Sequence, residues 1–273
     1  MISRSLAAAQ RVIRLPLRKR SYRIVPEDDA LRILGKASRK SLGNRFTLIS
    51  WNMYKARRRR WLEDLTQMAE QADFILLQEA VLHGDREHPF HVSSGFEWIM
   101  GQNFAYQSRP VTSGVKTGSR IAALSRRMVR SRDREPMIDL PKTILATEYD
   151  ILNSDGNLLL INIHAVNIVS AKKFTRQVEQ VEGMIENHRG PVILAGDFNT
   201  WNRRRQSIVF KAVERHGLQR VPVAAPQWRH LNQVLDHVFY RGVTLRSAAA
   251  LLNVRSSDHI PLKVEFEHAG GGK

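Results

Sequence analysis

Val192–Asn202 reads V-I-L-A-G-D-F-N-T-W-N. The four apolar residues at its start form a short run that is typical of a strand buried on both faces. The run stops at Gly196, and Asp197 and Asn199 follow two positions apart, so both side chains leave the sheet on the same side. Open α/β sheets place their chemistry at this end of their strands. The alternative to a functional site is an ordinary Asp/Asn/Gly turn after a strand. Polar residues at the ends of the other predicted strands make this alternative less favoured.

Several other predicted strands also run into a polar residue. The strands expected over 46–51, 73–78 and 158–164 each end at an amide, a carboxylate or a histidine. The polar residues at these ends and around the last strands are Asn52, Glu79, His164, Asn167, Asp236, His237, Asp258 and His259. One acid at a strand end is ordinary, but packing alone does not explain so many polar residues at strand ends. The sequence therefore predicts that these residues meet at one edge of the sheet.

These residue types are the ones that phosphodiester cleavage requires. A hard cation held by carboxylate oxygens neutralises charge in the transition state. A carboxylate activates the attacking water, and an amide or imidazole holds a non-bridging oxygen. A histidine next to an aspartate is oriented by it and favoured in its cationic form.

The pattern of the remaining elements favours mixed sheets. Two strands, 143–152 and 158–164, flank an S-D-G turn signal and predict a hairpin, whereas other strands alternate with helices. Residues 83–118, rich in His, Gly, Ser and Pro, are expected to be irregular connections around one or two strands. The other predicted elements are helices over 57–71, 172–188 and 204–216, and strands over 120–125, 234–240, 244–252 and 261–266. Dinucleotide and phosphate-loop motifs are absent, so a nucleoside triphosphate cofactor is not indicated.

Composition restricts the partners. The net charge of +17 over 273 residues suits an anionic partner, with nucleic acid first and anionic lipid second. Without cysteine there are no disulfides or thiolate metal sites, so a metal would be held by oxygens and imidazoles, which favours Mg²⁺ or Mn²⁺. The composition is compatible with a cytoplasmic location, and no apolar run approaches the roughly 20 residues of a bilayer span.

We expect three segments along the chain. Residues 1–44 form a flexible basic arm and linker with one short helix at 28–34, residues 45–268 form one catalytic domain, and residues 269–273 form a tail. Residues 1–45 hold 12 Lys/Arg and 3 Asp/Glu. The start of the arm resembles a transit peptide or a membrane-surface helix in composition, and membrane-surface contact is the second interpretation.

Taken in order, the motifs W-N, Q-E, G-D-F-N, L-D-H-V-F and S-D-H resemble the endonuclease/exonuclease/phosphatase superfamily of magnesium-dependent phosphoesterases. The resemblance spans residues 46 to about 267. The details W-N-M-Y-K, N-I-H-A-V-N and A-G-D-F-N-T-W-N-R-R-R are most similar to the bacterial YafD-like (UPF0294) group. The resemblance implies a four-layer α/β sandwich of the DNase I-like type, with two mixed sheets face to face and helices outside, and no stable protein partner.

The resemblance also implies metal ligands. Glu79 would bind the metal, with Asn52 close by and Asp258 completing its environment. The residue two after the W-N asparagine is often an acid in the repair nucleases, but here it is Tyr54. The number of metals and a preference for abasic sites therefore do not carry over.

Catalytic roles are implied in the same way. Asp197 would activate the water, Asn199 would steady the transition state, and His259 would contact the scissile phosphate, with Asp236 orienting it. Two further residues are His164, in a phosphate-contacting or leaving-group role, and Asn167, near the phosphate. Asn52 and Asn167 have a simpler alternative role as turn caps, and His237 is expected to be a strand residue rather than a ligand.

Basic clusters follow two of the catalytic strand ends, at 55–60 and 203–205. They either form solvated faces or line the same pocket and supply non-specific phosphate contacts. The residues expected to contact phosphate or to stack on the substrate are Arg203, Arg204, Arg205, Trp228 and Arg229. Trp201 is a further candidate for stacking, and a position in the core is an equal alternative for it.

The predicted function is a divalent-metal-dependent phosphoesterase, with a nuclease acting on DNA or RNA as the first choice. The alternative is a phosphatase or phosphodiesterase acting on a lipid head group or a small phosphorylated molecule. Inositol phosphatases of the superfamily carry a Trp-Cys-Asp-Arg signature where this chain has P-Q-W-R at 226–229, which weakens that alternative. A non-catalytic nucleic-acid-binding domain is disfavoured, because every principal catalytic position is present. DNA or RNA, and endonuclease or exonuclease action, are not distinguished.

Overall fold

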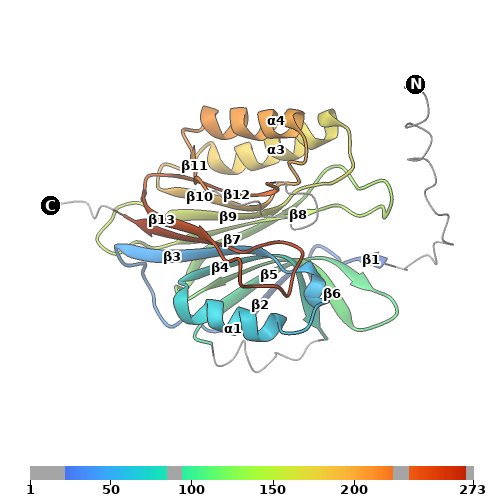
Figure 1. Cartoon of the computed structure of the whole chain (residues 1–273), viewed down its shortest axis with the longest axis horizontal. Helices are drawn as coiled ribbons and strands as arrows, with labels where there is room; N and C mark the ends of the chain where they lie inside the picture. The colour runs from blue at the N-terminus through green and yellow to red at the C-terminus, as the bar shows by residue number, and fades with distance from the viewer. Residues whose placement is uncertain (1–21, 85–93, 224–233, 269–273) are drawn as a thin grey trace, which may run out of the picture.

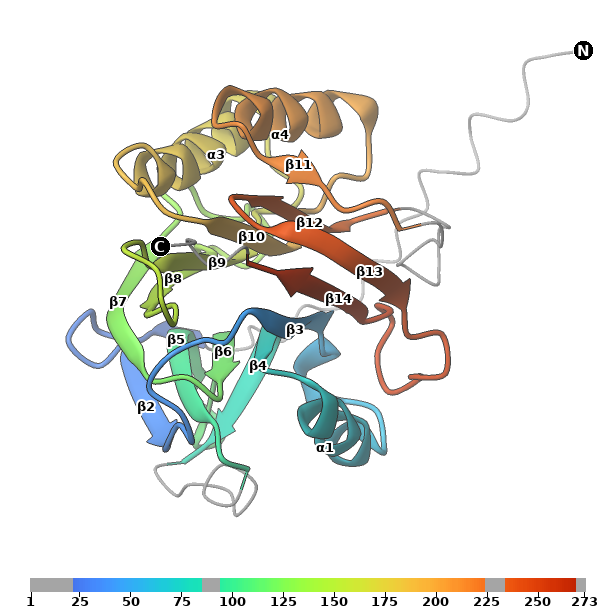
Figure 2. The same ribbon diagram turned by 90° about the vertical axis from the view of Figure 1, so that its left-hand side faces the viewer.

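Two β-sheets pack face to face, and helices cover their outer faces (Figures 1 and 2). The computed structural model describes residues 22–84, 94–223 and 234–268. Three apolar clusters define the layers: one lies between the two sheets, one under helices α3 and α4, and one under helix α1. This is the four-layer sandwich that the sequence predicted. Among the described residues, no helix has the length and apolarity needed to cross a bilayer.

The larger sheet has the strand order β1-β5-β6-β4-β3-β14-β13, and β2 pairs with β5. Only β3 and β4 are parallel among its neighbouring pairs. Its strands are β1 (Tyr22–Ile24), β2 (Leu31–Gly35), β3 (Arg45–Asn52), β4 (Phe74–His83), β5 (Glu97–Tyr106), β6 (Val111–Ser119), β13 (Thr244–Ala250) and β14 (Leu262–Glu267). The turn η2 (Tyr54–Ala56) and helix α1 (Trp61–Gln71) connect β3 to β4.

The smaller sheet has the order β11-β12-β10-β9-β8-β7 and carries the predicted β8–β9 hairpin. Strands β9 and β10 are parallel, and helix α3 connects them across the outer face. Its elements are β7 (Ala123–Arg130), β8 (Thr143–Tyr149), β9 (Leu158–His164), α3 (Ala171–Ile185), β10 (Val192–Asp197), α4 (Arg203–Arg215), β11 (Gln219–Arg220) and β12 (Asp236–Arg241).

Strand β10 shows why a continuous apolar run was the right signal for a central strand. Ile193 and Ala195 pack into the core between the sheets, whereas Val192 and Leu194 pack under α3 and α4. Because side chains alternate between the two faces, a strand covered on both must be apolar at every position. Asn202 caps α4 by accepting a hydrogen bond from the Arg205 amide at 2.8 Å, so the chain turns into a helix soon after the strand.

Two sequence predictions are wrong in this fold. The sheet begins before residue 45: β1 and β2 pair with β5, so residues 22–44 are not a flexible linker, and the helix expected at 28–34 is replaced by a strand from Leu31. Pairing with β5 outweighs the local pattern there. The one or two strands expected within 83–118 are β5 and β6, and they take up most of residues 97–119, because glycines serve packing within them. At Gly118, a Cβ atom would lie 2.4 Å from the Trp98 ring.

Candidate active site

The register of the smaller sheet brings three of the predicted residues side by side. Asp197 of β10 lies opposite His164 of the parallel strand β9 and opposite Asp236 of the antiparallel strand β12. Gly196, just before Asp197, has a φ of 143°, and a Cβ atom there would lie 2.0 Å from the carbonyl oxygen of Ile163. A side chain at position 196 is therefore excluded, which explains the glycine of the G-D-F-N motif.

His259 forms an ion pair with Asp236. The Nδ1 atom of His259 lies 2.6 Å from the Oδ2 atom of Asp236, and both side chains are buried. Burial alone would lower the pKa of His259, but the carboxylates of Asp236, Asp197 and Asp258 together raise it to about 10. His259 is therefore cationic at neutral pH, with Nδ1 donating to Asp236 and Nε2 left for another acceptor.

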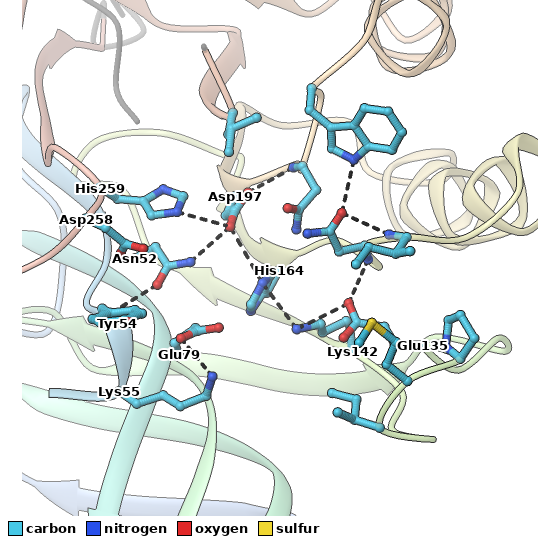
Figure 3. Close-up of a pocket in the computed structure, with 18 residues that line it drawn as sticks. Asn52, Tyr54, Lys55, Glu79, Glu135, Lys142, His164, Asp197, Asp258 and His259 are labelled. Carbon is cyan, nitrogen blue, oxygen red and sulfur yellow. Dashed lines mark hydrogen bonds and ion pairs between the residues drawn. The ribbon is translucent and has the colours of Figure 1, made fainter. Parts of the chain in front are cut away.

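Asp197 is the hub of the polar network. Its Oδ2 atom accepts a hydrogen bond from Asn52 Nδ2 at 2.9 Å and lies 3.9 Å from His259 Nε2, and its Oδ1 atom accepts the Asn199 amide at 2.9 Å (Figure 3). Burial raises the pKa of Asp197 to about 6; His259 and the two hydrogen bonds oppose the rise, and Asp236 adds to it. A carboxylate of this pKa is ionised at pH 7 and still accepts a proton readily.

Glu79 reaches the same pocket from the other sheet. It lies at a bulge of β4 between Leu77 and Ala80, with a φ of 50°, a conformation that is rare for residues other than glycine. Its Oε2 atom lies 3.0 Å from the Nζ atom of Lys55. Although burial would raise the pKa of Glu79, Lys55 and Lys142 hold it below its usual value. Glu79 is therefore an anion inside the protein.

Lys55 reaches Glu79 because the chain turns in an unusual way after β3. Tyr54, Lys55 and Ala56 have φ angles of 52°, 54° and 53°, which is a left-handed turn made without glycine. The next arginines of the basic cluster have structural contacts: Arg58 donates to the Ser257 carbonyl at 2.5 Å, and Arg57 lies over the Tyr54 ring. Of the basic cluster at 55–60, Lys55 therefore lies in the pocket, whereas Arg57 and Arg58 bind protein groups around it.

Lys142 and Glu135, which the sequence did not single out, complete the row beyond His164. The Nζ atom of Lys142 lies 3.4 Å from His164 Nε2 and 3.4 Å from Glu135 Oε1. Burial first, and then Lys142 and Lys55, hold the pKa of His164 well below 6.5. Because an ammonium group can only donate, Nε2 of His164 accepts from Lys142 and the ring is neutral. Lys142 follows a loop and carries no motif, so no sequence signal identified it.

The loop before β14 is fastened to the end of β3. Ser257 donates its hydroxyl to the Asn52 carbonyl at 2.6 Å and accepts the His259 amide at 3.1 Å. Serine in the S-D-H motif therefore fixes where Asp258 and His259 lie relative to Asn52. The motif is a loop held in place by its own first residue.

One pocket of about 600 Å³ is lined by Lys55, Glu135, Lys142 and most of the predicted residues, and Asp236 lies behind His259. Figure 3 shows side chains from both sheets pointing into it. The predicted residues that line it are Asn52, Glu79, His164, Asn167, Asp197, Asn199, Asp258 and His259. Residues scattered over two hundred positions therefore meet in one place, as the sequence predicted.

Other predicted contacts are not in the pocket. Arg203 and Arg204 are exposed on the first turn of α4, whereas Arg205 is buried, with its guanidinium 3.8 Å from the Phe174 ring centroid and donating to the Val166 carbonyl. Arg205 is thus a packing residue in this structure, because α4 presents every third or fourth side chain to the core. Trp228 and Arg229 lie outside the described residues.

Three further expectations concern residues around the site. Asn167 accepts hydrogen bonds from the Ile168 amide and from Trp201 Nε1, at 2.9 and 3.0 Å, so its oxygen already holds protein groups. Trp201 is not a core residue, since it is exposed and lines the pocket. His237 is a buried strand residue, as expected, and lies among aromatic rings.

The donor set fits a hard divalent cation. Glu79 offers a half-buried carboxylate, Asn52 a carbonyl oxygen that also accepts the Tyr54 amide at 3.1 Å, and Asp258 a second carboxylate, all lining the pocket. Oxygen ligands of this kind suit Mg²⁺ or Mn²⁺. Asp197, Asp236 and His259 also have donor atoms within 4.8 Å of one another. There, however, a cation would compete with the short Asp236–His259 hydrogen bond.

Comparison with known proteins agrees with this geometry. The model of the endonuclease/exonuclease/phosphatase family matches residues 49–259, which run from β3 to His259. The chain belongs to this family. The family hydrolyses phosphoester bonds and depends on divalent metals. UPF0294 protein YE0917 of Yersinia enterocolitica is 39% identical over 220 residues, 80% of this chain and 82% of that protein, which supports the UPF0294 group as well.

Two solved structures share the fold of this chain. The endonuclease/exonuclease/phosphatase protein from Beutenbergia cavernae has a TM-score of 0.64 at 16% identity, over 83% of this chain and 72% of that chain. The 3′ phosphatase NExo from Neisseria, solved with a product DNA hairpin, has a TM-score of 0.58 at 18% identity, over 81% and 99%. Both support the DNase I-like sandwich.

Proposed function

We propose that this protein is a divalent-metal-dependent nuclease that hydrolyses phosphodiester bonds of DNA or RNA. One observation carries the proposal: a buried carboxylate, Asp197, lies 3.9 Å from a buried cationic imidazole, His259, at the base of a pocket open to solvent. A base and a fixed positive charge at this spacing suit water activation beside a phosphate.

In the proposed reaction, Asp197 orients a water molecule and takes its proton while the water oxygen bonds to phosphorus. Nε2 of His259 donates to a non-bridging oxygen, and Asp236 keeps that imidazole charged. Asn199 gives one N–H of its amide to the Ala165 carbonyl at 2.9 Å, so its other N–H is left for the phosphate. The bond to the leaving oxygen breaks as the new bond forms.

Glu79, Asn52 and Asp258 would hold the metal, which supplies charge neutralisation for the phosphate and its leaving oxygen when bound. His164 and Lys142 lie on the opposite side of Asp197 from His259. Since His164 is neutral, we assign the positive charge on that side to Lys142 and a positioning role to His164.

A nucleic-acid substrate is supported by charge. The net charge of +17 gives a polyanion a long-range attraction that a small neutral molecule does not need. The Neisseria relative, solved with DNA, shares the fold. A phosphatase acting on a lipid head group or a small phosphorylated molecule is the alternative outcome of the experiment.

The test is a substrate panel with Mg²⁺ or Mn²⁺: single- and double-stranded DNA and RNA, a small phosphomonoester and phospholipid vesicles. We expect cleavage of nucleic acid that EDTA abolishes. Asp197→Ala should lower kcat roughly 10³-fold, because it removes the base, and Asp155→Ala, an exposed acid of the β8–β9 turn, should leave kcat unchanged. Cleavage of another substrate without nucleic acid would establish the alternative, and no cleavage at all would refute both.

Metal binding has its own test. Glu79→Gln should weaken Mn²⁺ binding roughly 10-fold or more, measured by electron paramagnetic resonance without substrate, because it removes an anionic oxygen ligand. The matched control is Glu70→Gln, an exposed acid of α1. Equal Mn²⁺ affinity of the Glu79→Gln variant and the wild type would exclude Glu79 as a ligand.

A further inference from the structure

One side of the active-site pocket is apolar and open to solvent. The apolar rim consists of Met137, Ile138, Ile168 and Trp201, which come from three separate connections. Met137, Ile168 and Trp201 are 71%, 59% and 41% exposed. Among the described residues, eight large hydrophobic side chains are exposed, and four of these eight are the rim. Exposed apolar side chains that gather at a pocket mark a binding surface more often than chance.

The rim is held in place by specific bonds. Asn167 accepts both the Ile168 amide and Trp201 Nε1, and its own amide donates to Glu135 Oε1 at 2.7 Å. The three connections are thus joined through one residue, by the side chain of Asn167 on one side and by its backbone amide on the other. Beneath them, the guanidinium of Arg205 lies 5.5 Å from the Trp201 ring centroid. The indole is therefore fixed by its polar edge while its ring is left partly open.

Ile168 provides an independent observation. Its φ is 49°, and a β-branched residue with positive φ is a genuine outlier. Its side chain is exposed, so no packing gain in the described structure offsets that conformation. Strain of this kind persists where the surroundings hold it for a function. Here it holds an isoleucine side chain at the pocket, close to Trp201.

We propose that the apolar rim binds one unstacked nucleobase next to the scissile phosphate, so that the substrate is single-stranded or frayed nucleic acid. This proposal rests on the proposed function and names its substrate class. A base within a duplex has both faces covered by its neighbours and cannot reach such a surface, whereas a splayed base stacks on an aromatic ring. Arg203 and Arg204, exposed just beyond Trp201, suit the phosphates that follow.

A base is favoured over an acyl chain by two features of the rim. Its largest member is an aromatic ring fixed by a hydrogen bond, which gives a flat surface for another ring. The rim is also continuous with the proposed phosphate site, in a pocket that holds the ammonium groups of Lys55 and Lys142, and a phosphate attached to the base would be attracted to these charges.

The experiment measures binding in EDTA, so that no cleavage is needed. Fluorescence anisotropy compares a short single-stranded oligonucleotide with a strand of the same backbone that lacks bases. We expect the wild type to bind the base-carrying strand roughly 10-fold more tightly. Trp201→Ala should reduce this preference to about 2-fold or less, and Trp201→Phe should retain most of it. The control Leu152→Ala, an exposed leucine away from the pocket, should retain all of it.

Two results would overturn the proposal: no preference in the wild type, or an unchanged preference in Trp201→Ala. In the second case, a Trp201→Ala variant that no longer sediments with phospholipid vesicles, where the wild type does, would assign the rim to lipid. The outcome is separable from the proposed function, because a protein that shows the Trp201-dependent preference but cleaves no phosphodiester would keep the rim and refute the nuclease.

Discussion

Asp236 has one histidine beside it in space, His259, and another beside it in the sequence, His237, and the two rings have opposite charge states. Both are buried, with 6% and 4% of their surface exposed. His259 meets the Asp236 carboxylate at 2.6 Å, and its pKa is raised to about 10. His237 follows Asp236 in β12 but points to the other face of the sheet, among the rings of Phe198, Phe210 and Phe239. Its pKa is lowered to about 3 by burial and by Arg220.

The difference shows that burial alone does not decide what a histidine does. Without a carboxylate, burial makes the neutral ring the stable form, and His237 is satisfied by Thr200 Oγ1 at 2.7 Å from Nε2. With a carboxylate in contact, burial strengthens the attraction between the charges and keeps the ring cationic. The alternation of side chains along β12 thus separates the Asp236–His259 ion pair, to which we assign a catalytic role, from an apolar core within two residues.

Of the two histidines, His259 is expected to have by far the larger effect on activity when it is removed. His259→Ala should lower kcat roughly 10²- to 10³-fold, because it removes a preorganised cation at the phosphate. His237→Phe should change kcat by less than about 3-fold, since it only replaces one ring by another beneath the sheet. Steady-state kinetics of the two variants at pH 7.5 provides the measurement. Similar losses in both would mean that the two histidines do not differ as described.

A smaller effect is expected for the acid stability that His237 controls. Its pKa in the folded protein lies below the value of about 6.5 in the unfolded chain, so below pH 6.5 the unfolded state binds a proton that the folded state does not. Stability from this group is complete above pH 6.5 and falls as the pH drops towards 3, by on the order of 2 kcal/mol at pH 4.5.

Urea denaturation at pH 7.5 and pH 4.5 checks this prediction. The loss of unfolding free energy between the two pH values should be smaller in His237→Phe than in the wild type. The Thr200 hydroxyl keeps a partner in the variant, because it also donates to the Val234 carbonyl at 3.0 Å. An identical loss in both proteins would show that His237 is not buried as a neutral ring.

Much of the fold and of the site was accessible from the sequence because strand ends carry local signals. The apolar run 192–195 and the polar residues after it are adjacent in the sequence, so both the strand and the polar residues at its end were predicted. Parallel pairing of β9 and β10 then places His164 opposite Asp197. Where a polar residue of the site directly follows a strand, the periodicity of the strand and the order of the motifs were enough to predict its position.

The misses have a different physical origin. Strands β1 and β2 depend on pairing with β5, a contact across about seventy positions that no local pattern encodes. The burial of Arg205 depends on how α4 packs against the rest of the domain, where the guanidinium meets Phe174. Lys142 enters the pocket because β8 begins beside His164. Apart from Trp201, which was a candidate for stacking, the apolar rim was missed for the same reason, since its members come from three connections.

The central claim is that Asp236 keeps a buried imidazole cationic for phosphodiester cleavage. Asp236→Asn, with almost the same shape and no charge, tests it most directly, in a comparison of kcat with the wild type and His237→Phe on one oligonucleotide with Mg²⁺. We predict that the wild type and His237→Phe cleave at similar rates and that Asp236→Asn is slower roughly 10²-fold. Cleavage by Asp236→Asn at the wild-type rate, or no cleavage by the wild type with any divalent metal, would contradict the account.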